Sequence, residues 1–156
     1  CTSNTIMIFE ALLTIPSHPA KLKEVRHWLI EPAQQANLTE EDLADVQLAT
    51  MEACANIIEH AYEGRFDQPI ALAVAANDGE LKLTIRNGGK PFSLDEYQPP
   101  TVNQHIDSGY GIYLMQQAMD TVSFNRSATG ETVLTMVKYR GQRKPATHGT
   151  KRKGRR

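Results

Sequence analysis

Two polar residues that could act together, Glu52 and Asn56, lie four positions apart in a stretch that is otherwise alanine and cysteine. In a helix, this spacing places both side chains on one face. A carboxylate and a carboxamide on one face can hold a hydrated Mg²⁺ ion and provide a base beside it. The pair therefore predicts chemistry at a metal-bound group.

A glycine pattern follows about fifty residues later, where Ser108-Gly109-Tyr110-Gly111 precedes an apolar segment at 112–119. A glycine pair at the start of a helix can offer bare backbone N–H groups to phosphate. Neither pattern is specific by itself. In this order, they predict a nucleotide site.

The spacing of Glu52 and Asn56 also has a simpler explanation, because such pairs are common on solvated helix faces. Their neighbours Ala53, Ala55 and Ile57 predict instead that the stretch is largely buried. Unpaired polar groups are costly in a buried setting. This favours a functional site.

Length and composition limit the protein classes. A chain of 156 residues with 40% hydrophobic and 22% charged residues is typical of one globular domain. No apolar run reaches the roughly twenty residues that span a membrane, and no signal-peptide pattern is present. Because the two cysteines, Cys1 and Cys54, are not expected to pair, a reducing cytoplasm is the predicted compartment.

Charge divides the chain into two parts. Residues 140–156 contain eight Lys or Arg and no acid, which leaves a net charge of −9 for residues 1–139. We predict a domain over 1–139 and a basic tail over 140–156 that is expected to be disordered. A basic tail can contact nucleic acid or an acidic surface, but solvated ends are commoner, and no nucleic-acid partner is expected.

The hydrophobic periodicity predicts the elements that position these residues. Runs rich in β-branched residues predict strands at about 6–15, 70–76, 81–86, 121–126 and 132–139. Helical spacing predicts helices from a Ser17 cap to a break near Ile30–Pro32, from Thr39 to about Tyr62, and over 112–119. Residues 93–108 are expected to be a loop. This order predicts an α+β fold: a two-layer sandwich with a mostly antiparallel mixed sheet and helices on one face.

Four pieces of the sequence together resemble a known family. They are Glu52-x-x-x-Asn56, Asn87-Gly88-Gly89, Gly109-x-Gly111 and the closing hairpin through Gly130. In this order they resemble the Bergerat ATP-binding fold of the gyrase, histidine-kinase and MutL superfamily. Residues 51–62 are similar to the anti-sigma-factor serine kinases of bacterial partner switching, whose helix typically contains Glu-Ala-x-x-Asn-x-x-x-His-Ala-Tyr. The resemblance covers about residues 6–139.

The resemblance implies a role for each matching residue. Asn56 would ligate Mg²⁺ at the phosphates of ATP, and Glu52 would accept the proton of a protein serine that attacks the γ-phosphate. Backbone N–H groups at Gly109, Tyr110 and Gly111 would bind the phosphates. The remaining nucleotide contacts would come from Asn87 and Gly89, at the adenine end, and from Thr132. For His60 of the same helix, packing is expected rather than a ligand contact.

Three positions depart from the family pattern. Asn87 stands where the family has an Asp that accepts a hydrogen bond from the adenine amino group; the Asn87 Oδ1 can still accept this bond, but without the charge-assisted contribution. Asp107 stands where many relatives have Arg facing the phosphates. Glu131 stands where a Thr is common, although the adjacent Thr132 could take its place. All three changes predict weaker nucleotide binding.

The resemblance therefore implies a regulatory kinase. It would bind ATP and Mg²⁺, sequester a sigma factor and phosphorylate a serine of an antagonist protein; a homodimer is expected. The alternative is a module of the same fold that binds a sigma factor or other regulator with weak nucleotide binding or no kinase activity. A third hypothesis, the catalytic domain of a sensor histidine kinase, is disfavoured by the short loop over 93–108.

Overall fold

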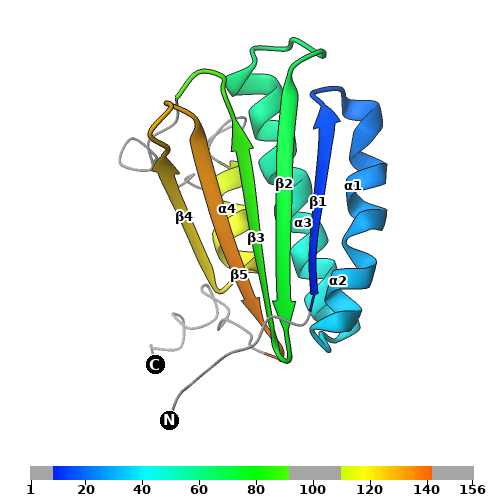
Figure 1. Ribbon diagram of the computed structural model, residues 1–156. Helices are drawn as coiled ribbons and strands as arrows, with labels where there is room; N and C mark the ends of the chain where they lie inside the picture. The colour runs from blue at the N-terminus through cyan, green and yellow to red at the C-terminus, as the bar shows by residue number, and fades with distance from the viewer. Residues whose placement is uncertain (1–8, 92–109, 142–156) are drawn as a thin grey trace, which may run out of the picture.

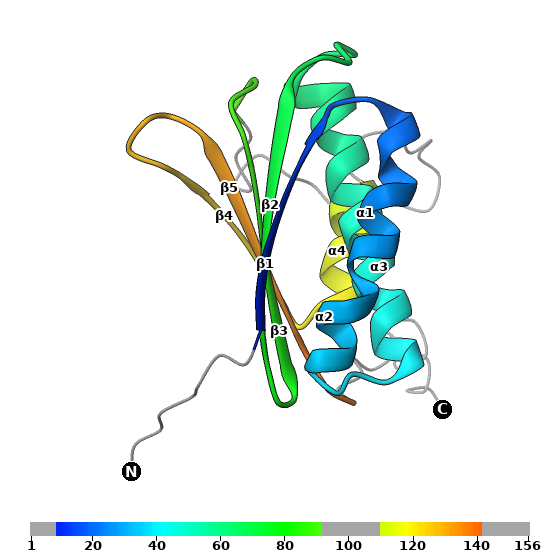
Figure 2. The same ribbon diagram turned by 45° about the vertical axis from the view of Figure 1, so that its right-hand side comes forward.

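A five-stranded sheet forms one layer of the computed structural model, and helices cover one face of it (Figure 1 and Figure 2). The structure describes residues 9–91 and 110–141. The strand order is β1-β2-β3-β5-β4, with every neighbouring pair antiparallel. The strands are β1 Phe9–Pro16, β2 Pro69–Asn77, β3 Glu80–Asn87, β4 Thr121–Arg126 and β5 Thr132–Tyr139. The predicted two-layer α+β fold is confirmed, and in the described residues its sheet is antiparallel rather than mixed.

Alternation along the strands explains why the helices cover only one face. In β2, Ile70, Leu72 and Val74 are buried, whereas the residues between them are partly exposed. Successive side chains of a strand point to opposite faces of the sheet, so these three face the helices. By the same alternation, the last residue of β3 and the first of β5, Asn87 and Thr132, also belong to the helix-facing set.

Four α-helices form the second layer within the described residues. They are α1 Leu22–Trp28, α2 Ile30–Gln35, α3 Glu40–Asn56 and α4 Tyr110–Ala118, and a short 3₁₀ turn, Pro19–Lys21, precedes α1. The predicted break between the first two helices falls at Leu29. Pro32 lies in the first turn of α2, where a missing N–H group is tolerated.

The cap predicted at Ser17 is wrong. His18 caps the 3₁₀ turn instead, because its Nδ1 accepts the N–H of Ala20 at 3.0 Å. Ser17 is buried and joins two chain segments: its hydroxyl donates to the carbonyl of Arg65 at 2.6 Å and accepts the N–H of Gln68 at 3.0 Å. It therefore holds the end of β1 against the segment that leads into β2.

Helix α3 carries Glu52 and Asn56 and begins at the predicted position. Thr39 and Asp42 form a capping box, in which each side chain accepts the backbone N–H of the other residue. The periodicity predicts one helix that continues to about Tyr62, but the structure differs. After Asn56 it widens into a π-helical turn, Ile57–Ala61, and the chain then leaves through Gly64 with a φ of +81°. Such turns recur at functional sites.

Lys138 of β5 is the one lysine that is buried among the described residues, with 3% of its surface exposed. Its ammonium donates to the carboxylate of Asp45 on α3 at 2.9 Å and to the carbonyl of Ala118 at the end of α4 at 2.8 Å. One side chain thus ties both helices to the sheet.

None of the helices in the described part of the chain has the length and hydrophobicity needed to cross a membrane.

Candidate functional site

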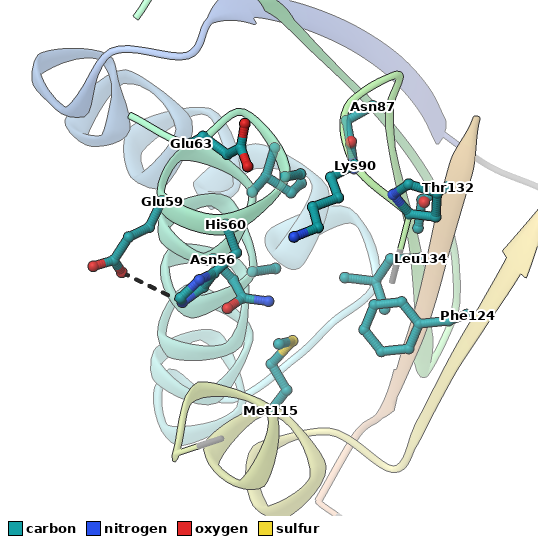
Figure 3. Close-up of a pocket in the computed structure, with 14 residues that line it drawn as sticks. Asn56, Glu59, His60, Glu63, Asn87, Lys90, Met115, Phe124, Thr132 and Leu134 are labelled. Carbon is teal, nitrogen blue, oxygen red and sulfur yellow. Dashed lines mark ion pairs between the residues drawn. The ribbon is translucent and has the colours of Figure 1, made fainter. Parts of the chain in front are cut away.

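A cavity of about 380 Å³ lies between the C-terminal end of α3 with its π-helical turn, the helix α4, and the strands β3, β4 and β5 (Figure 3). This volume falls in the range of small-molecule sites. Its apolar wall includes Met115, Phe124 and Leu134. Asn56 lines the wall formed by α3, while Asn87 and Thr132 lie toward the other end of the cavity (Figure 3). Three of the predicted site residues are therefore brought together in one cavity.

Asn87 and Thr132 form its buried polar end. They are direct cross-strand partners, and only 5% and 6% of their surfaces are exposed. The Asn87 Oδ1 accepts the N–H of Gly89 at 2.9 Å, which fixes the orientation of the amide. Among the residues that the structure describes, neither the Asn87 Nδ2 nor the Thr132 hydroxyl has a hydrogen-bond partner. Buried polar groups normally have one, so both are suited to a polar ligand.

Glu52 does not line this cavity, although it lies one helical turn before Asn56. Both side chains are half-buried, and the intervening Ala55 is exposed, so the stretch is less buried than predicted. The Glu52 carboxylate lies beside the start of α4: a Cβ on Gly111 would come within 3.1 Å of its Oε1. The predicted base is therefore next to the predicted phosphate-binding segment.

The start of α4 contains two of the three residues predicted to bind phosphates. Tyr110 is exposed and stacks on Tyr113 with a ring-centre distance of 5.8 Å. Gly111 packs against Glu52. Gly109 lies outside the described residues, as do Asp107 and the predicted loop over 93–108. The described part of α4 contributes Met115 to the cavity wall.

Gly89 is not among the described residues that line the cavity. A Cβ at this position would overlap the carbonyl of Ala61 and lie 2.9 Å from the ring of Tyr62. The same carbonyl accepts the N–H of Lys90 at 2.8 Å. The Tyr62 hydroxyl accepts the N–H of Gly88 at 3.0 Å and donates to the carbonyl of Pro69 at 2.6 Å. The turn after β3 is thereby fixed to the end of the π-helical turn.

Gly89→Ala is therefore expected to lower the free energy of unfolding by about 2 kcal/mol, since backbone atoms must move to admit the methyl group. Gly88→Ala is the matched control. A Cβ there meets no atom within 4 Å, and Gly88 has no positive φ. Urea denaturation of the two variants measures the difference. Equal stabilities would show that Gly89 is not held against Ala61.

Several cavity residues were missed by the sequence patterns. Lys90 extends into the cavity, and His60, expected to pack, is exposed at the rim with Glu59 and Glu63 (Figure 3). No spacing pattern in the sequence identifies Lys90, because its position in the cavity depends on the turn after β3. Glu131 lies away from this set and forms an ion pair with Arg86 at 3.8 Å, while Thr132 lines the cavity.

Two other forms of chemistry are disfavoured. Burial raises the pKa of the Cys54 thiol to about 12, so it stays protonated and unreactive at neutral pH. No cluster of three or more His, Cys, Asp or Glu residues in the described ranges could hold a metal ion. A metal at Asn56 would therefore need ligands from a bound molecule and water, as Mg²⁺ commonly has.

The chain is similar to known proteins over most of its length. The profile of the family described as "Histidine kinase-like ATPase domain" matches residues 15–138. The serine-protein kinase RsbW of Bacillus velezensis is 32% identical over 147 residues, which cover 88% of this chain and 89% of that protein. The anti-sigma F factor of Bacillus thuringiensis is 32% identical over 109 residues, covering 67% of this chain and 75% of its own.

A solved structure supports the fold. The RsbU and RsbW domains of a Mycobacterium tuberculosis protein match with a TM-score of 0.61 and 20% sequence identity. The match covers 88% of this chain and 35% of that longer chain. At this identity the similarity concerns the fold alone.

Proposed function

The chain belongs to the family of histidine kinase-like ATPase domains, and from this premise we propose that it is an anti-sigma regulatory factor with serine kinase activity. It would bind ATP with Mg²⁺, sequester a sigma factor and phosphorylate a serine of an antagonist protein. The names of its relatives, a serine-protein kinase and an anti-sigma F factor, support both halves of this proposal. A cytoplasmic location and a homodimer are part of the same proposal.

The observation that carries the proposal is the composition of the cavity. The Asn87 Nδ2 and the Thr132 hydroxyl, both buried and without a partner among the described residues, are suited to the edge of a base. The apolar side chains of Phe124 and Leu134 are suited to its faces. Asn56 on the opposite wall supplies an oxygen that Mg²⁺ accepts as a ligand. The placement of these groups along the cavity matches a nucleotide whose base lies at β3 and whose phosphates extend toward α3 and α4.

Glu52 is the proposed base. Its carboxylate lies beside the start of α4, where the backbone N–H groups of Tyr110 and Gly111 would bind phosphate oxygens. A serine hydroxyl positioned there would pass its proton to Glu52 as its oxygen bonds to the terminal phosphorus and ADP leaves. Mg²⁺, when bound, would neutralise charge on the phosphates. The contribution of the chain is to position the groups and accept the proton.

Asn56→Leu is expected to weaken Mg²⁺-dependent ATP binding by about tenfold or more, because it removes the oxygen ligand at similar volume. Asn56→Asp retains an oxygen and should retain the dependence on Mg²⁺. Calorimetric titrations with Mg²⁺ and with EDTA separate the two variants. If Asn56→Leu kept the full effect of Mg²⁺, the ligand assignment would be wrong.

The kinase proposal itself is tested by titrating ATP and ADP into the protein by calorimetry, with and without Mg²⁺. Micromolar, Mg²⁺-dependent binding is the expected result. Absence of binding at millimolar nucleotide would favour the alternative, a binding module of the same fold that acts without nucleotide. One observation favours this alternative: the Asn87 Oδ1 already accepts the N–H of Gly89.

A further inference from the structure

One positively charged side chain, that of Lys90, enters the cavity. It extends from the turn after β3 toward the wall formed by α3 (Figure 3), and it is the one lysine or arginine among the described residues that line the cavity. Its backbone is fixed, because its N–H donates to the carbonyl of Ala61 at 2.8 Å. Within residues 9–91 and 110–141, its ammonium takes part in no ion pair. Its charge is therefore available to a ligand.

The surroundings of Lys90 are otherwise negative. Residues 1–139 carry a net charge of −9, and Glu59 and Glu63 line the same cavity. The other described lining side chain that can become cationic, His60, lies 3.8 Å from the Glu59 carboxylate. Water and salt screen charges at such an exposed rim, but they do not reverse their sign. A ligand with several negative charges therefore gains most from contact with Lys90.

The backbone places Lys90 between the two polar parts of the cavity. Lys90 follows Asn87 by three positions, and its partner Ala61 follows Asn56 by five positions. The side chain thus leads from the Asn87 end toward the α3 wall that contains Asn56 (Figure 3). An ammonium on a flexible four-carbon stem is a compact point charge that binds phosphate oxygens from many directions. Its contact with a phosphate does not depend on which edge of a base faces Asn87.

We propose that Lys90 binds a phosphate oxygen of the nucleotide and is the cationic side chain by which this cavity holds the phosphate chain. The proposal rests on the proposed nucleotide-binding function and adds a residue that determines affinity for the anionic part of the ligand. Asn56 and Lys90 would then act on the same group: the amide through a metal ion, the ammonium directly.

The test is calorimetric titration of the full chain with ATP and Mg²⁺ at low and at high NaCl concentration. Lys90→Met removes the charge and keeps the length of the side chain. It is expected to weaken binding at low salt by about five- to tenfold, since a hydrogen bond to a charged group is lost at a partly solvated site. Its affinity should also depend less on salt than that of the unmodified chain. Lys90→Arg keeps the charge and should bind within about threefold of the unmodified chain.

Lys82→Met is the matched control. Lys82 is exposed on β3 and does not line the cavity, so this variant removes the same charge away from the site. It should bind ATP within about twofold of the unmodified chain, because solvent screens distant exposed charges.

Equal ATP affinities for Lys90→Met and Lys82→Met would overturn the inference and leave the proposed kinase function standing. A loss of affinity in Lys90→Met with an unchanged salt dependence would also overturn it, because the side chain would then act through packing rather than charge. Absence of ATP binding by the unmodified chain at millimolar concentration would overturn both the inference and the proposed function.

Discussion

Replacing Glu52 with Gln is expected to slow phosphoryl transfer to a protein serine by about 10²–10⁴-fold, because a neutral amide cannot accept the serine proton. Nucleotide binding should change little, since Glu52 does not line the cavity that holds Asn56, Asn87 and Thr132. Single-turnover transfer from ATP, measured beside calorimetric binding, separates the two effects. The assay uses as its substrate the serine-bearing antagonist protein that the proposed function requires.

Two comparisons make this prediction specific. Glu52→Ala should lose transfer to a similar extent while binding of the sigma-factor partner stays nearly unchanged. Glu24→Ala, at an exposed position in the first turn of α1, should transfer at the rate of the unmodified chain. Transfer that survives in Glu52→Gln would assign the base to another residue, whereas parallel loss of binding and transfer would indicate a structural role.

Replacing Asp45 with Ala is expected to lower the free energy of unfolding by about 3–5 kcal/mol. Lys138 would keep its bond to the carbonyl of Ala118 but lose its anionic partner while 3% exposed. A buried charge without its counter-ion is costly because the interior does not replace the water that it lost. Urea denaturation measures the change.

Replacement of the other member of the ion pair, Lys138, provides the control. Lys138→Met fills a similar volume with an apolar chain and leaves Asp45, whose side chain is 31% exposed, able to hydrate. Lys138→Met should lower the free energy of unfolding much less than Asp45→Ala does. The stability of the double variant should be close to that of Lys138→Met alone. Equal losses of unfolding free energy in the two single variants would show that Asp45 does not stabilise the fold as the counter-ion of Lys138.

Local patterns predicted most of the fold. The strands β4 and β5 and the Thr39 cap of α3 were predicted directly, because β-branched composition and capping chemistry are local properties. The π-helical turn Ile57–Ala61 was not predicted, since one extra residue in a turn hardly alters the hydrophobic pattern. The cap at Ser17 failed because a long-range contact with the segment before β2 engages its hydroxyl.

The site was predicted in part for a similar reason. The spacing of the Glu52 and Asn56 pair selected Asn56, and the family resemblance implied Asn87 and Thr132; the fold brings all three to one cavity. The orientation of the Asn87 amide depends on the N–H of Gly89, and the entry of Lys90 depends on the turn after β3. Both are consequences of backbone geometry that a spacing pattern does not contain. The relation of Glu52 to Gly111 likewise exists only once α3 and α4 are packed together.

The contact between the turn after β3 and the end of α3 has a thermodynamic consequence. Because Ala61 accepts the N–H of Lys90 and the Tyr62 hydroxyl accepts that of Gly88, the end of the cavity at Asn87 is hydrogen-bonded to the end of the helix. A protein that binds to the exposed end of the helix and shifts it is therefore expected to shift the Asn87 end of the cavity as well. Such linkage is reciprocal: by whatever factor the nucleotide changes affinity for that protein, the protein changes affinity for the nucleotide by the same factor.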